Sequence, residues 1–109
     1  MAVAPLRSNR ENDVHGGALP GELALILGPT PARGPVRVCF EVPKDEWVSV
    51  CLFNSLGRRV VTLVSGLECA GRHEVRWDGT VSGKRRAGVY SCRITAQNES
   101  RESSVLVLK

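Results

Sequence analysis

Nucleophilic catalysis needs a cysteine or serine beside a histidine and an orienting carboxylate. The only local set with these residue types is Cys69, His73 and Asp78. His73 lies in a segment where apolar and polar residues alternate, so we expect it on a strand, with opposite parity to Asp78. Cys69 falls in an expected loop. These side chains diverge, and we expect no catalytic residues; a small hydrolase that uses Cys69 and His73 remains the contrasting hypothesis.

Metal and cofactor sites have equally little support. His73, Glu74 and Asp78 also diverge on a strand, and neither His15 nor His73 has finger-like spacing from a cysteine. The sequence contains no dinucleotide-binding glycine motif, no P-loop and no H-E-x-x-H motif. We therefore expect no metal and no cofactor. Two disulfides, free thiols or a mixture remain open for the four cysteines, which are Cys39, Cys51, Cys69 and Cys92.

The elements that would position these residues all have the period of a β-strand. From Val36 onward, apolar residues alternate with polar ones, and turn residues separate the runs about every ten residues. The expected long strands cover 36–42, 48–52, 59–65, 73–77, 90–96 and 104–108, and a short edge strand covers 22–27. Loops are expected at 43–46, 54–57, 66–71, 78–87 and 97–101. No segment has helical spacing.

This pattern predicts an all-β fold, an immunoglobulin-like antiparallel β-sandwich of about seven strands. Residues 1–22 lack periodicity and are rich in glycine and proline, so we expect a disordered N-terminal tail or linker there. The domain then covers residues 23–109. Within it, the proline- and glycine-rich stretch 28–35 is expected to interrupt regular structure.

Whether Cys39 and Cys51 can form a disulfide depends on which strands pair. If the first two long strands form a hairpin with Phe40 opposite Val50, Cys39 lies opposite Cys51 on the outward face. Directly opposed β-carbons are about 4.5–5.5 Å apart, slightly long for a disulfide, which prefers about 3.5–4.5 Å. Cys92 is expected to face inward as a buried thiol.

Charge and hydropathy argue against nucleic acids and membranes as binding partners. Residues 36–109 hold twelve basic and eight acidic side chains, which accounts for the whole net charge of +4. The small basic clusters are best explained as solvated turns, and five aromatic residues are too few for a nucleic-acid surface that interleaves rings with charges. No apolar run is long enough to cross a bilayer, so membrane insertion is not expected. The N-terminus lacks the apolar region of a secretory signal peptide.

Several stretches resemble one known family. Trp77-Asp78-Gly79 is the most distinctive, because the indole can anchor a two-sheet core while the aspartate and glycine form the turn that follows. Together with the preceding Ala70–Arg76 run, Gly88-Val89-Tyr90 and the terminal Val105–Lys109, the chain resembles the FlgD-type immunoglobulin-like domain. That domain is closely similar to the C-terminal sorting domains of type IX secretion.

The resemblance implies a non-enzymatic role. Such a domain follows a passenger in the same chain, and export machinery recognises its fold and last strand, so the protein would be secreted or held at the cell surface. The alternative is an assembly scaffold or adhesion module, similar to the flagellar hook cap, that binds protein or glycan. The resemblance places recognition at Gly88, Val89, Tyr90 and Lys109, and structural roles at Trp77, Asp78, Gly79, Gly57 and Gly71.

Overall fold

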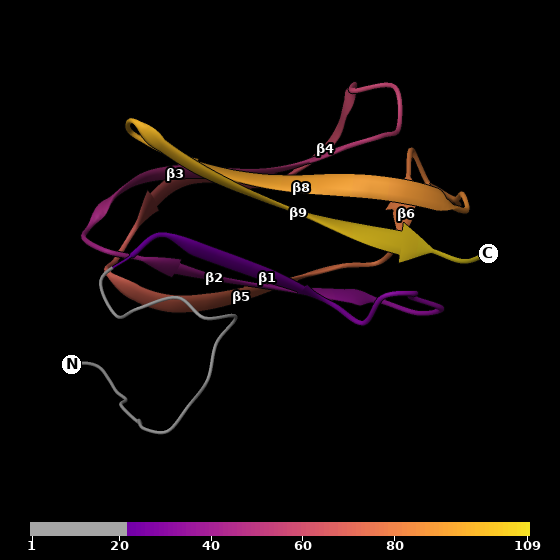
Figure 1. The fold of residues 1–109 in the computed structure, drawn as a ribbon, viewed down its shortest axis with the longest axis horizontal. Coiled ribbons are helices and arrows are strands. Elements are labelled where there is room, and N and C mark those ends of the chain that lie inside the picture. Colours follow the sequence, from indigo (N-terminus) through magenta and orange to yellow (C-terminus); the bar gives the residue numbers. More distant parts are fainter. Residues whose placement is uncertain (1–21) are drawn as a thin grey trace.

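The structure, a computed structural model, describes residues 22–109. Two antiparallel sheets pack face to face, with a small hairpin at one end (Figure 1). The smaller sheet has the order β1-β2-β5, with β1 (Ala24–Gly28), β2 (Val36–Val42) and β5 (Gly71–Trp77). The larger has the order β4-β3-β8-β9, with β3 (Glu46–Phe53), β4 (Arg59–Glu68), β8 (Gly88–Ala96) and β9 (Glu99–Val107). The hairpin joins β6 (Thr80–Val81) and β7 (Lys84–Arg85). The predicted all-β antiparallel sandwich of about seven strands is confirmed, since the two sheets contain three and four strands.

The core lies between the two sheets and follows the alternation in the sequence. In β2, the side chains with even numbers point inward and are buried, whereas those between them point to solvent. The same parity holds in β3 and β8. The buried inward-facing residues of these three strands are Val36, Val38, Phe40, Val42, Val48, Val50, Leu52, Tyr90, Cys92, Ile94 and Ala96. These are the residues at alternate positions of the predicted strands, so the sequence pattern alone identifies most of the core.

The hairpin considered for the first two long strands does not form. β2 pairs with β1 and β5, whereas β3 pairs with β4 and β8, so the chain changes sheets between Val42 and Glu46. Alternation fixes which face of a strand is buried but not which strand lies beside it. Cys39 and Cys51 consequently belong to different sheets instead of facing each other. All four cysteines are free thiols, and Cys92 is fully buried, as expected.

Three expected loops are shorter than the sequence suggested. β4 continues to Glu68 and β5 begins at Gly71, so little of the expected 66–71 loop remains. β9 begins at Glu99, which shortens the expected 97–101 turn. Polar residues extend β9 because the outward face of a sandwich sheet is solvated. The expected 78–87 loop contains the β6–β7 hairpin, and the expected short strand is β1. The tail expected over 1–22 lies outside the described residues except for Glu22.

The proline-rich segment after β1 runs beside β9 and closes one side of the sandwich. The Ala32 amide donates a hydrogen bond to the Leu106 carbonyl (2.7 Å), and the Leu108 amide donates to the Ala32 carbonyl (2.8 Å). The Leu106 amide also donates to the Thr30 hydroxyl at 3.0 Å. The prolyl bonds of Pro29 and Pro31 are cis. On the opposite side, β4 and β5 are the outermost strands of their sheets.

Candidate functional site

The residues that the resemblance assigns to recognition lie together at the open end of the chain's final hairpin, where Gly88 pairs with Val107 and Lys109 follows β9. Gly88, Val89 and Tyr90 begin β8, and β9 pairs with β8 along its whole length. Val89 points outward with 52% of its surface exposed, beside Leu106 of β9, which is 39% exposed. Tyr90 points inward and is buried. Val89 is therefore a surface residue, whereas Tyr90 packs in the core beneath the same strand.

Tyr90 packs against the tryptophan of the Trp-Asp-Gly turn. The two rings meet edge to face, with centroids 5.1 Å apart and planes at 71°, an arrangement that aromatic quadrupoles favour. The Tyr90 hydroxyl donates a hydrogen bond to the Arg86 carbonyl (3.0 Å), and the Trp77 indole N–H donates to the Thr80 carbonyl (2.9 Å). Both buried rings therefore have their polar atoms satisfied, and the contact joins β5 to β8 across the core.

Asp78 and Gly79 shape the turn that follows Trp77. One carboxylate oxygen of Asp78 accepts hydrogen bonds from the Thr80 hydroxyl (2.7 Å) and the Thr80 amide (2.9 Å). Because these bonds favour the ionised form, they lower the pKa of Asp78. Gly79 has a positive φ of 85°, and a β-carbon there would overlap the guanidinium of Arg85. Glycine is thus needed both for the backbone angle and for the close approach of Arg85.

Arg85 is the residue that ties this turn to the end of the chain. Its guanidinium donates hydrogen bonds to four main-chain carbonyls: Leu108 (2.8 Å), Ala32 (3.0 Å), Gly34 (3.1 Å) and Asp78 (3.1 Å). Sequence reasoning missed this role and assigned Arg85 to a solvated basic cluster. Its partners are backbone atoms up to 53 positions away, and no pattern of side-chain types marks such a contact.

The last strand is held from two sides. Every residue of β9 has a partner on β8, from Glu99 opposite Ala96 to Val107 opposite Gly88. Val105 and Val107 are buried in the core, and the segment around Ala32 covers the other edge of the strand's end. Lys109 is exposed just beyond β9. A protein that recognises this strand in the folded domain therefore meets its outward face and its end.

Gly57 and Gly71, the two remaining glycines with an expected structural role, lie where the chain changes direction. Gly57 has a φ of 82° and closes the β3–β4 hairpin, where its amide donates to the Asn54 carbonyl (2.9 Å). The side-chain oxygen of Asn54 accepts further hydrogen bonds from the amides of Leu56 (2.9 Å) and Arg58 (3.0 Å). Gly71 begins β5.

His73 meets Cys69 through the backbone rather than through the thiol. One ring nitrogen, Nε2, lies 2.7 Å from the Cys69 carbonyl oxygen, and the other, Nδ1, lies 3.4 Å from a carboxylate oxygen of Glu68. The ring also stacks on Phe40 at 5.1 Å. Asp78 follows the opposite end of β5. Within residues 22–109, no group of three or more histidine, cysteine or acidic side chains is arranged to hold a metal ion.

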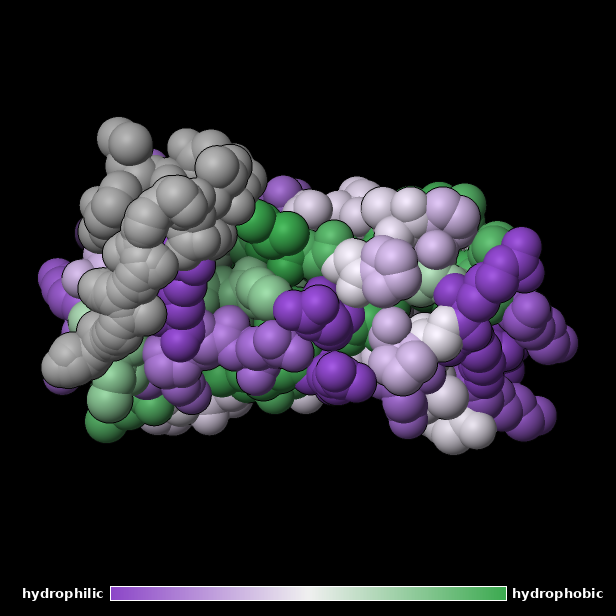
Figure 2. All heavy atoms as spheres, turned by 90° about the horizontal axis from the view of Figure 1, so that it is seen from below, coloured by the Kyte–Doolittle hydropathy of each residue, from purple (hydrophilic) through white to green (hydrophobic). Residues whose placement is uncertain are grey.

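The outer face of the smaller sheet carries cross-strand ion pairs. Figure 2 views this side of the molecule and shows hydrophilic side chains interspersed with hydrophobic ones. Arg37 contacts Glu74 at 3.3 Å, Arg76 contacts the same carboxylate at 3.9 Å, and Arg72 contacts Glu41 at 3.7 Å. The hydrogen bond that the Arg37 guanidinium donates to the Glu74 carboxylate raises the pKa of Arg37. On this face each arginine has an acidic neighbour.

Comparison with known proteins supports the fold. No protein-family model matches the chain, and no curated protein matches it. Among solved structures, the chain is similar to dimeric latent PorU from Porphyromonas gingivalis, with a TM-score of 0.61 and 21% sequence identity. The match covers 87% of this chain but only 10% of that one.

The described residues contain no helix long and apolar enough to cross a membrane.

Proposed function

We propose that this chain is a non-catalytic sorting and anchoring module of a secreted or cell-surface bacterial protein. In this proposal, the export machinery recognises the folded sandwich and its last strand. The module needs no cofactor, and its partners are proteins of the secretion machinery together with a passenger carried in the same chain.

One observation carries the proposal. The stretches that resemble the FlgD-type family are far apart in sequence but meet beside the end of β9. Trp77 packs on Tyr90 of β8, the strand that pairs with β9, and Arg85 connects Asp78 to Leu108, just after β9. Residues with no catalytic geometry are thus arranged to support the C-terminal strand. The similarity to one tenth of the much longer PorU chain is consistent with a fold that occurs as a small part of a larger protein.

A reporter fusion tests this function. The reporter carries a signal peptide for export to the periplasm and is followed by residues 22–109, and the host is a bacterium with a working type IX system. We expect the reporter at the cell surface or in the medium. The matched control is the same fusion in a strain whose type IX outer-membrane machinery is deleted, where the reporter should remain in the periplasm. Periplasmic retention in both strains would contradict the proposal.

The outer strands of the two sheets favour a second candidate, an assembly or adhesion module. β4 and β5 each pair with a described strand on one side only, and such an edge can accept an extended segment of another protein. A pulldown and a glycan array with the folded module test this role. Binding that is lost when proline replaces Val64 of β4 would support strand addition, and the absence of any specific ligand would count against it.

A further inference from the structure

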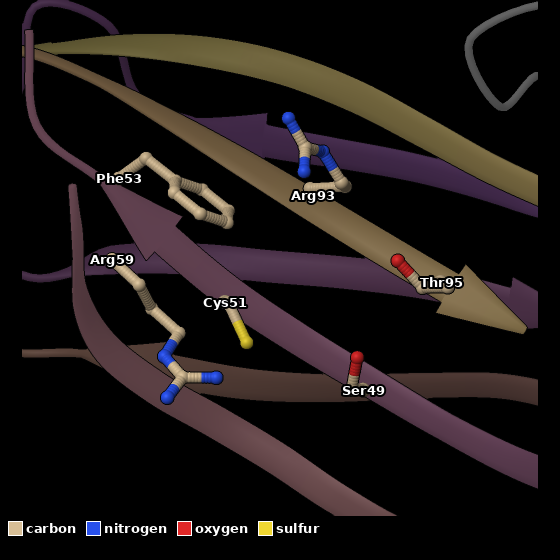
Figure 3. Close-up of a pocket in the computed structure, with 6 residues that line it drawn as sticks. All are labelled: Ser49, Cys51, Phe53, Arg59, Arg93 and Thr95. Carbon is tan, nitrogen blue, oxygen red and sulfur yellow. The ribbon is translucent and has the colours of Figure 1, made fainter. Parts of the chain in front are cut away.

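The outer face of the larger sheet has a shallow depression that the proposed function does not use. It encloses about 410 Å³ and is lined by three adjacent strands (Figure 3): Ser49, Cys51 and Phe53 of β3, Arg59 of β4, and Arg93 and Thr95 of β8. A second depression shares Phe53 and Arg93 and extends to Val89 and Ser91. Together they form one open groove along β3 and β8, here called the β3–β8 groove.

Arg93 is fixed in this groove but keeps free donors. Its guanidinium carbon lies over the Phe53 ring, 4.6 Å from the ring centre, within the distance at which a cation is attracted to an aromatic face. Its only carboxylate contact among the described residues is a single 3.5 Å approach to Glu102, at the long limit of a hydrogen bond. A better-placed carboxylate can therefore replace Glu102.

Arg59 adds a second cation on the other side of β3. It is exposed, lies opposite Phe53 in the register of β3 and β4, and has no hydrogen bond or ion pair to the part of the chain that the structure describes. This differs from the smaller sheet, where Arg37 and Arg76 lie beside Glu74. The groove thus holds one guanidinium without an acidic partner among the described residues, that of Arg59, and one with a single long contact, that of Arg93.

We propose that the β3–β8 groove binds an acidic peptide in extended conformation, with its carboxylates held by Arg59 and Arg93. Arg93 lies beside Cys51 and Arg59 beside Phe53, on opposite sides of β3. Sheet spacings place their Cα atoms about 12 Å apart. Alternate side chains of an extended peptide share one side and repeat every ~6.7 Å, so glutamates two or four positions apart reach both guanidinium groups. Each guanidinium can hold a carboxylate through two parallel hydrogen bonds.

The rest of the groove favours a peptide over a saccharide. Sugar rings bind by stacking on open aromatic faces, but Arg93 already covers the Phe53 ring. The groove follows β3 and β8, which suits an extended backbone. The hydroxyl groups of Ser49 and Thr95 at one end of the groove supply donors for the carbonyl groups of such a backbone.

Binding of a fluorescein-labelled peptide of alternating glutamate and serine, measured by anisotropy at low salt, tests the proposal. We expect saturable binding that weakens about ten-fold in either R59Q or R93Q, because each substitution removes one charge-assisted carboxylate contact. R76Q is the matched control, since it removes the same charge from the opposite sheet, where Arg76 is exposed, and it should bind as the native chain does. In ¹⁵N spectra, the peptide should shift the amides of Ser49, Cys51 and Thr95.

Three results would overturn the proposal. The first is no binding of the acidic peptide to the native chain. The second is equal weakening in R76Q, which would mean that net charge alone attracts the peptide. The third is tighter, arginine-dependent binding of polygalacturonate, which would assign the groove to an anionic saccharide. Circular dichroism of each variant ensures that a loss of binding is not a loss of fold.

Discussion

Replacing Arg85 with alanine should destabilise the domain more than any other change of an arginine. The guanidinium donates to four carbonyls, of which those of Leu108, Ala32 and Gly34 are in part-buried contacts, whereas the Asp78 contact is exposed and can be replaced by water. At about 1–2 kcal/mol for each part-buried carbonyl that loses its donor, the free energy of unfolding should fall by about 3–6 kcal/mol. For a domain of this size, that loss lowers Tm by at least about 12 °C.

Urea unfolding followed by tryptophan fluorescence measures this change. Trp77 is buried, so its fluorescence changes when the core is lost, whereas Trp47 is 58% exposed and contributes little to the change in fluorescence. Lys84→Ala is the matched control in the same hairpin, and it should change the free energy of unfolding by less than about 0.5 kcal/mol. Arg85→Lys should fall between the two, because an ammonium group cannot reach all the carbonyls at once. If Arg85→Ala is as stable as the Lys84→Ala control, the account of Arg85 is wrong.

Three further outcomes follow from the same structure. Gly79→Ala should approach the instability of Arg85→Ala because its β-carbon displaces that guanidinium, whereas Gly83→Ala, with a similar φ of 81° and open space around it, should cost only about 1 kcal/mol; urea unfolding compares them. Burial raises the pKa of Cys92 from its ordinary 9.0 to about 12, so between these pH values the unfolded thiol is ionised and the folded one is not. As the pH rises through this range, the free energy of unfolding of the native chain should therefore fall more steeply than that of Cys92→Ala, by about 1.4 kcal/mol per pH unit. Urea unfolding at several pH values measures both slopes, and equal slopes would disprove this prediction. In native protein, a maleimide should modify the exposed Cys69 rapidly but spare Cys92, as mass spectrometry of timed samples can establish.

The sequence predicted the parts of the fold that depend on local alternation. The inward faces of β2, β3 and β8 were identified because one strand face is apolar in each, and the turn at Gly57 because its residue types match a hairpin. The partner of each strand was not predictable in the same way. The connection between Val42 and Glu46 is short and fits either a hairpin or a crossing between sheets. Only the packing of the whole core decides which of the two forms.

The sequence revealed less of the candidate site. Trp77 and Tyr90 were identified by type, but their mutual contact depends on how the two sheets stack. Arg85 was missed because its partners are main-chain carbonyls, which every residue possesses. The groove beside Arg59 and Arg93 was also hidden, since it requires the register of β3 with both β4 and β8.

The surface-exposed fraction of an exported reporter, measured by its accessibility to added protease on intact cells, tests the central claim most directly. The account predicts that a reporter followed by residues 22–109 reaches the surface of a type IX-competent bacterium, whereas the same reporter without these residues stays protected in the periplasm. It also predicts a reduced surface fraction when Lys109, exposed at the end of β9, is removed. Equal surface fractions with and without the module would contradict the proposed sorting function.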